Sequence, residues 1–477
     1  MVDKLSGLLE LIHVPLAVRS SSLLEDSRYQ PFAGIYSTYM IPNSHPERSL
    51  RLWELTNAIK AVYASTYRRR ARGYFEATNY RLEDERMAVI IQLLVGSRHE
   101  NRFYPNLAGV VRSHNYYPTP PVTSADGIAS VALGLGRTVM DGGLTVRFSP
   151  RYPRHIVQFS DPESTLQYSQ KEFYALNLDA HAATRDFRKE VVLEKYDLAT
   201  AERDGTLGPV ASTYSAENHA LYEGISRSGT RVVTLAPILN GRLFPLPEIL
   251  DYLMQLGSWS MNTPVEIEFA VDMSGAKDGR VQFAFLQLRP LMLGGEDTHV
   301  DLSAYAPEQL LCLSHKVLGN GIIDNIRDII VVDRERFNRA RTPEIAAEVG
   351  RLNGLLRKEH RPYVLIGLGR WGTADPWLGI PVTWDQISGA RVIVESGFED
   401  FMVTPSQGTH FFQNITSFQI GYFTVNVTGT NGMVDWQWLS ELPAETELQY
   451  VRHIRLPKPL TVRMDGHNNR GVITKPQ

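Results

Sequence analysis

Two apolar segments past the middle of the chain, Val265–Val271 and Val281–Leu288, do most to limit what this sequence can form. The stretch that joins them is polar and contains two glycines, which is typical of a loop between antiparallel strands. The sequence therefore predicts a hairpin, in which Glu268 and Gln287 lie on adjacent strands.

The charged residues of this hairpin share one face. Period-two alternation places Glu266 and Glu268 on the same side of the first strand, where their oxygen atoms can converge on a ligand. Arg289 follows Gln287 by two residues, so it lies on the same face, and its planar guanidinium suits phosphate oxygens. Taken alone, the pattern fits an ordinary Glu–Arg surface pair equally well.

Composition excludes several classes of protein. At roughly 100–200 residues per domain, 477 residues predict two or three domains. A net charge of −3 gives no electrostatic reason to expect a nucleic-acid or membrane partner. Cys312 is the only cysteine, which excludes an intrachain disulfide and a zinc site built from several thiolates. No apolar run approaches the about 18 residues that span a bilayer, so we expect a cytoplasmic protein.

Periodicity predicts several further elements. Met87–Val95 is expected to be a buried strand, and a capping box at Ser44–Glu47 is expected to open a helix that runs to about Ala77. Leu246–Met261 has the pattern of an amphipathic helix, and shorter helical pieces are expected around 163–175 and 215–226.

A linker divides the chain. Residues 291–306 are rich in glycine and acidic residues and show little periodicity, after which strand–helix–strand order begins again. We therefore expect a first domain over 1–292, a linker over 293–305 and a smaller α/β domain over 306–477.

Three separated parts of the first domain together resemble a known family. They are Val18-Arg-Ser-Ser21 with Glu25-Asp26 and Phe32-Ala-Gly34, then Met87–Gln92, and finally Val265–Asp272 with Phe285–Pro290. In order and spacing they are similar to the nucleotide-binding domain of phosphoenolpyruvate synthase and pyruvate phosphate dikinase. The resemblance covers roughly residues 14–292. It implies an α+β, ATP-grasp-like nucleotide-binding domain, followed here by the smaller α/β domain.

The resemblance also implies roles for particular residues. Glu268 and Gln287 would hold Mg²⁺, while Arg19 and Arg289 would contact the phosphates of ATP. Glu266 would lie beside them at the nucleotide. The adenine would rest against a hinge formed by Gln92, Leu93, Leu94 and Val95.

Two features of the family's pattern are not found in this sequence. The family's domain begins with a Gly-Gly-Lys segment well before the arginine loop, whereas only 18 residues precede Arg19 here. A second chain, or an N-terminal segment outside this sequence, would then complete the ATP site. The Thr-Ser-His-type motif of the swivelling phosphohistidine domain is also missing.

We therefore expect an ATP-dependent phosphotransferase that passes a phosphoryl group to a histidine or a small molecule. His410, within Pro405–Asn414, is a candidate acceptor or base, although a buried, hydrogen-bonded histidine fits the same residues. The alternative function is a catalytically degenerate ATP-binding sensor or scaffold. Gly367–Gly372 matches G-x-G-x-x-G, but Pro376 and Pro381 oppose the helix that a dinucleotide site needs. The sequence leaves the oligomeric state open.

Overall fold

The chain divides into two compact units, Met1–Leu291 (unit 1) and Met292–Gln477 (unit 2). The computed structural model describes residues 2–22, 25, 35–68, 71–72, 75, 85–116, 118–119, 121–159, 161–180, 192–275, 280–291, 300–373, 375, 377–397, 411–412, 415, 420–426, 432–466 and 468–476. Within these ranges no helix combines the length and the apolar composition needed to cross a bilayer. Both units mix helices with sheets, so the predicted α+β class is confirmed.

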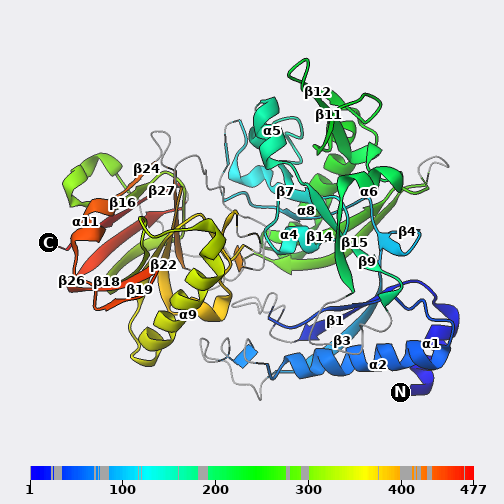
Figure 1. Cartoon of the computed structure of the whole chain (residues 1–477), viewed down its shortest axis with the longest axis horizontal. Helices are drawn as coiled ribbons and strands as arrows, with labels where there is room; N and C mark the ends of the chain where they lie inside the picture. The colour runs from blue at the N-terminus through cyan, green and yellow to red at the C-terminus, as the bar shows by residue number, and fades with distance from the viewer. Residues whose placement is uncertain are drawn as a thin grey trace. The chain divides into compact units, whose positions relative to one another are not determined.

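Unit 1 begins with a small antiparallel sheet in the order β2-β1-β3. Its strands are β1 (Leu16–Ser22), β2 (Tyr39–Ile41) and β3 (Met87–Leu93). The helices α1 (Val2–Leu11) and α2 (Arg48–Ser65) lie along this sheet (Figure 1). Leu16 and Val18 of β1 pack against Leu55 and Val62 of α2, so the neighbouring positions Ala17 and Arg19 face away from the helices.

The start of α2 differs from the sequence expectation. The helix begins at Arg48 with Glu47 as its N-cap residue, and no side chain caps it. The Ser44 hydroxyl instead donates a hydrogen bond to the Leu178 carbonyl at 2.8 Å. The predicted capping box is therefore wrong, because a tertiary contact uses the serine that would have capped the helix. Regular α2 also ends at Ser65, earlier than expected.

The centre of unit 1 is an antiparallel sheet in the order β15-β14-β6-β7-β8. Its strands are β6 (Leu107–Arg112), β7 (Ile128–Ala132), β8 (Val146–Phe148), β14 (Val265–Asp272) and β15 (Gln282–Pro290). The helix α8 (Leu246–Met261) packs its buried Leu250 and Met254 into the core that Val265 and Ile267 share. The predicted hairpin and the predicted helix over 246–261 are both confirmed.

Smaller elements surround this sheet. They are the strands β4 (Ser97–His99), β5 (Arg102–Tyr104), β9 (Glu172–Asn177), β10 (Leu193–Asp197), β11 (Ala211–Ser215), β12 (Ala220–Glu223) and β13 (Thr230–Val233), and the helices α4 (Arg137–Met140), α5 (Pro162–Tyr168), α6 (Leu198–Arg203) and α7 (Ala236–Leu239). The helix expected over 163–175 ends at Tyr168, and its second half is β9. The helix expected over 215–226 is wrong, because Ala220–Glu223 pairs with β11 as a strand.

Unit 2 is a mixed sheet in the order β17-β23-β22-β19-β18-β26-β27-β16-β24. Its strands are β16 (Leu310–Ser314), β17 (Val317–Leu318), β18 (Asn320–Val332), β19 (Tyr363–Leu368), β22 (Ala390–Ser396), β23 (Gly421–Val425), β24 (Gly432–Val434), β25 (Thr446–Glu447), β26 (Val451–Asp465) and β27 (Arg470–Thr474). Neighbours among β18, β19, β22 and β23 pair in parallel. Two helices among the described residues of unit 2 are α9 (Thr342–Lys358), which lies beside this parallel part (Figure 1), and α11 (Trp436–Glu441).

Candidate functional site

Polar side chains from three strands of unit 1 meet at one place. Arg19 comes from β1, Glu268 from β14, and Gln287 and Arg289 from β15, and Glu25 follows β1 in the chain. We call these five residues the Arg19–Arg289 cluster. Because β1 belongs to the N-terminal sheet and the hairpin to the central sheet, the cluster lies where these two sheets approach each other.

The contacts within the cluster link both arginines to the hairpin. The Arg19 guanidinium donates to Gln287 Oε1 and lies 3.6 Å from Glu268 Oε2. Arg289 forms two ion pairs within the cluster, at 3.3 Å to Glu25 Oε1 and at 4.0 Å to Glu268 Oε1. Glu268 therefore faces two guanidinium groups at once, and the structure brings together Arg19, Glu268, Gln287 and Arg289.

The cluster is only slightly accessible to solvent. The side chains of Arg19 and Glu268 are 16% and 15% exposed, and those of Arg289 and Glu25 are 7% exposed. Two arginines and two glutamates leave it formally neutral. A polyanion bound with a divalent cation suits such a site, because the guanidinium groups can attract phosphate oxygens while the carboxylates attract the cation.

A β-bulge in the hairpin decides which side chains reach this cluster. Glu268 is opposite Gln287, but the next residue, Phe269, is opposite Phe285, so Leu286 is an extra residue in β15. A bulge changes the alternation of side chains along a strand. Phe285 consequently lines a pocket beside α8, whereas Gln287 joins the polar cluster.

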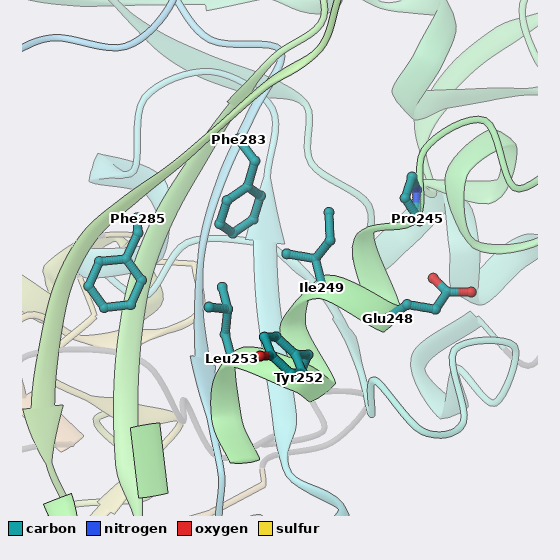
Figure 2. Close-up of a pocket in the computed structure, with 7 residues that line it drawn as sticks. All are labelled: Pro245, Glu248, Ile249, Tyr252, Leu253, Phe283 and Phe285. Atoms are coloured by element: carbon teal, nitrogen blue, oxygen red, sulfur yellow. The ribbon is translucent and has the colours of Figure 1, made fainter. Parts of the chain in front are cut away.

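The pocket beside α8 is apolar and has a volume of about 490 Å³. Figure 2 shows it between α8 and β15, lined by Pro245, Glu248, Ile249, Tyr252, Leu253, Phe283 and Phe285. None of the cluster residues lines it. Its two phenylalanines belong to the α8 side of the hairpin, so this pocket is distinct from the polar site.

Glu266 has a partner that the sequence did not reveal. Its carboxylate lies 2.5 Å from the guanidinium of Arg112 on β6, and both side chains are 1% exposed. Glu266 thus lies on the hairpin face that the alternation predicted, in a buried ion pair. Arg112 could have been noticed as the one charged residue that ends the apolar strand Leu107–Arg112.

The residues expected at the hinge lie at the end of β3 and just after it. Gln92 pairs with Ala17 on β1, two positions before Arg19, so Gln92 and Arg19 share the face of the sheet that is turned away from α2. Leu93 is 50% exposed, and the Leu94 amide donates to the Pro15 carbonyl at 2.9 Å. Val95 is partly buried.

The comparison with protein families identifies the class of this chain. Residues 2–309, which are 308 of the 477 residues, match the family described as pyruvate phosphate dikinase, AMP/ATP-binding domain. The chain belongs to this family, which confirms the resemblance seen in the sequence and supports a nucleotide-binding, phosphotransferase-like role.

A relative points the same way. The protein named "Uncharacterized phosphotransferase YvkC" of Bacillus subtilis (strain 168) is 27% identical to this chain over 219 residues. The match covers 43% of this chain and 23% of the relative, so this chain spans only about a quarter of the relative's length.

The sequence motifs of unit 2 have different outcomes. His410, the candidate acceptor, lies outside the described residues. In Gly367–Gly372, Arg370 and Trp371 form a short strand, β20 (Arg370–Trp371), which pairs with β21 (Gly379–Ile380). The described part of this segment contains no helix directly after the glycines, which argues against a dinucleotide site.

Asp328, Glu445 and His453 of unit 2 could together ligate a metal ion. Arg361 already occupies this group, since it donates to both carboxylates of Asp328 and Glu445. A cation would have to displace a guanidinium, so the cluster is better described as an ion-pair network, which is buried at Asp328 and His453 and exposed at Glu445.

The ion-pair network of Asp328 leads to a prediction about thermal stability at low pH. Burial acts to raise the pKa of Asp328, but hydrogen bonds with His453 and Arg361 lower it below its ordinary value. Such a carboxyl stabilises the fold above its unfolded-state pKa, and the contribution is lost as the pH falls through the folded-state pKa. We expect thermal stability to fall between about pH 5 and pH 2, and to fall less steeply in Asp328→Asn. Calorimetry of the wild type and of Asp328→Asn over this pH range measures the change. Equal slopes of melting temperature against pH in the two proteins would contradict the prediction.

Proposed function

We propose that unit 1 binds ATP in an ATP-grasp-like site, and that the chain transfers the γ-phosphoryl group to a histidine or a small-molecule acceptor. The Arg19–Arg289 cluster carries this proposal. Two guanidinium groups and two carboxylates converge from separate sheets, as phosphoryl transfer requires, since it depends on positioning and on neutralising charge. Family membership supports the nucleotide-binding part of the proposal.

The residues at the cluster fit a magnesium ion. Glu268 and Gln287 are direct partners across the hairpin, and each offers an oxygen atom of the kind that Mg²⁺ prefers. A magnesium ion held by these two residues would neutralise negative charge on the phosphates. Arg19 now contacts both oxygen donors. In the proposed complex Arg19 turns its guanidinium to the phosphates instead, and Arg289 contacts them from its present position beside Glu268.

The adenine is proposed to lie against the hinge at Gln92, Leu93, Leu94 and Val95. Support comes from the register of the N-terminal sheet, which places Gln92 on the same face as Arg19 and two strand positions away from it. At roughly 3.3 Å per residue, this spacing suits a nucleotide that extends from the hinge to the arginine.

Calorimetric titration of the full chain with ATP, with and without Mg²⁺, tests the binding step. We expect binding that is stronger with Mg²⁺, and label from γ-³²P-ATP on the protein or on a product. Absence of ATP binding under both conditions would refute the proposal. The control is Glu248→Gln, which changes a carboxylate of unit 1 at the apolar pocket and should leave binding unchanged.

A degenerate ATP-binding sensor is the second candidate, and one observation favours it. Among the described lysines of unit 1, none makes a hydrogen bond or ion pair with the Arg19–Arg289 cluster. A sensor would bind MgATP and leave no label on protein or product. An enzyme would show both binding and label, so the same two measurements separate the candidates.

A further inference from the structure

The parallel strands of unit 2 bring three matching positions together. Gly367 on β19 pairs with Glu395 on β22, and Glu395 pairs with Thr424 on β23. All three lie near the carboxyl ends of their strands. Because they are aligned in register, these three positions belong to the same face of the sheet. In open sheets of parallel strands, ligands bind outside these carboxyl ends.

Glu395 is buried at this place, and one of its oxygen atoms has no partner in the described part of the chain. The residue is 1% exposed. Its Oε1 accepts a hydrogen bond from the Trp371 amide at 2.8 Å, and the Tyr422 hydroxyl also bonds to the carboxyl group. No hydrogen-bond partner for Oε2 exists among the described residues.

Thr424, on the neighbouring strand, is also a buried residue with an unpartnered polar atom among the described residues. It is 1% exposed, and its hydroxyl has no hydrogen-bond partner within the described ranges. Its backbone is fully engaged, because the amide donates to the Lys316 carbonyl and the carbonyl accepts from Ser314 Oγ at 2.6 Å. A buried polar group left without a partner is destabilising, so two of them on adjacent strands indicate a place for a ligand.

The groups around Glu395 determine whether its carboxyl group is charged. Burial raises the pKa of Glu395 to about 7, although the Tyr422 hydroxyl, the Trp371 amide and the positive charge of Arg370 all act to lower it. Near neutral pH the carboxyl group can therefore carry a proton and donate it in a hydrogen bond. The Trp371 ring lies against Gly367, where a Cβ would be 2.2 Å from Cζ2, and forms an apolar wall.

We propose that Glu395, Thr424 and Arg370 form a binding site for a small carboxylate anion. A protonated carboxyl group, a hydroxyl and a guanidinium are three donors, and two of them lie on adjacent strands as the two oxygens of a planar carboxylate require. Above neutral pH, Glu395 takes up one proton from solvent on binding, and the ligand stays a carboxylate. The site belongs to unit 2 and does not depend on the function proposed for unit 1.

Acetate is the probe for the first test. The full chain is titrated with sodium acetate by calorimetry at about pH 6 and pH 8, in two buffers that differ in ionisation heat. We expect affinity to fall by up to about tenfold per pH unit above the Glu395 pKa, with uptake of nearly one proton per acetate at about pH 8. No acetate binding at either pH overturns the proposal.

Two variants separate this site from a merely structural role. Glu395→Gln keeps an acceptor for the Trp371 amide and a donor for the ligand, so it should bind acetate without the pH dependence and without proton uptake. Thr424→Val should weaken binding about tenfold at both pH values. Glu344→Gln, an exposed carboxylate on α9, is the matched control and should behave as the wild type.

The remaining outcomes also decide the proposal. Proton uptake that persists in Glu395→Gln overturns it, because another group would then be titrating. Inorganic phosphate that binds in place of acetate, with the same dependence on Glu395, overturns the class of ligand. If Thr424→Val does not fold, as judged by circular dichroism, the pH profile of Glu395→Gln still decides.

Discussion

Replacing Arg289 with alanine is expected to lower the rate of γ-phosphoryl transfer by at least about a hundredfold. The side chain of Arg289 is 7% exposed near the end of β15 and lies 4.0 Å from Glu268, the proposed magnesium ligand. Its guanidinium is therefore fixed in place before ATP binds, and such a preorganised charge contributes most where negative charge develops. The rate is measured as label transferred from γ-³²P-ATP at saturating nucleotide, together with the Kd of MgATP.

Two companion variants make this result specific. Arg289→Lys keeps the charge but loses the planar fork, so an intermediate rate is expected. Arg151→Ala removes another arginine of unit 1 that pairs with two carboxylates, Asp126 and Asp251, outside the cluster. It should leave the rate unchanged. A wild-type rate and affinity in Arg289→Ala would remove Arg289 from the proposed site.

The elements that sequence predicted well are those whose patterns agree with their tertiary surroundings. The helix over 246–261 has an apolar stripe that packs into the core of unit 1, and the hairpin of β14 and β15 has apolar strands joined by a polar loop. The segment 215–226 shows the opposite case. Its local composition favours a helix, but ladder pairing of Ala220–Glu223 with β11 outweighs that preference.

The candidate site was predictable only in part. Alternation correctly placed Glu268, Gln287 and Arg289 on one face, because Gln287 and Arg289 both follow the bulge at Leu286 and Glu268 is opposite Gln287. Alternation alone would also have put Phe285 there, since no residue in the strand marks an inserted position. The ion pair of Arg112 was not predicted, because its partner Glu266 is 154 positions away in sequence.

Glu395 illustrates a second limit of sequence reasoning. The sequence indicates a strand over Arg391–Glu395, and a glutamate at its end could equally have faced solvent. Two other segments of the chain decide otherwise. The Trp371 amide and the Tyr422 hydroxyl bond to the carboxyl group, and the charge of Arg370, next to Trp371, acts on it as well. These residues are brought next to Glu395 only when the sheet folds, so the sequence around Glu395 does not indicate them.

The buried pair of Arg112 and Glu266 should dominate the stability of unit 1. Replacing either residue alone, as in Arg112→Met or Glu266→Leu, is expected to lower the free energy of unfolding by about 3–5 kcal/mol, because it leaves one buried charge without its partner. The double variant should regain most of that loss, since two apolar side chains need no compensation. Native-state hydrogen exchange of the amides in β6 and β14 measures the change where the pair lies.

An exposed ion pair in unit 2 serves as the control that shows whether burial causes the expected loss of stability. Arg336 and Glu447 are joined at 2.5 Å, as Arg112 and Glu266 are, but their side chains are each 48% exposed. Water already solvates both charges there, so Arg336→Met should change stability little. If the two single variants of the buried pair were as mild as Arg336→Met, or if the double variant lost as much as the two single variants added together, the ion pair would not hold β6 to β14. The attachment of these strands would then rest on their backbone hydrogen bonds and on apolar packing around Val265 and Ile267.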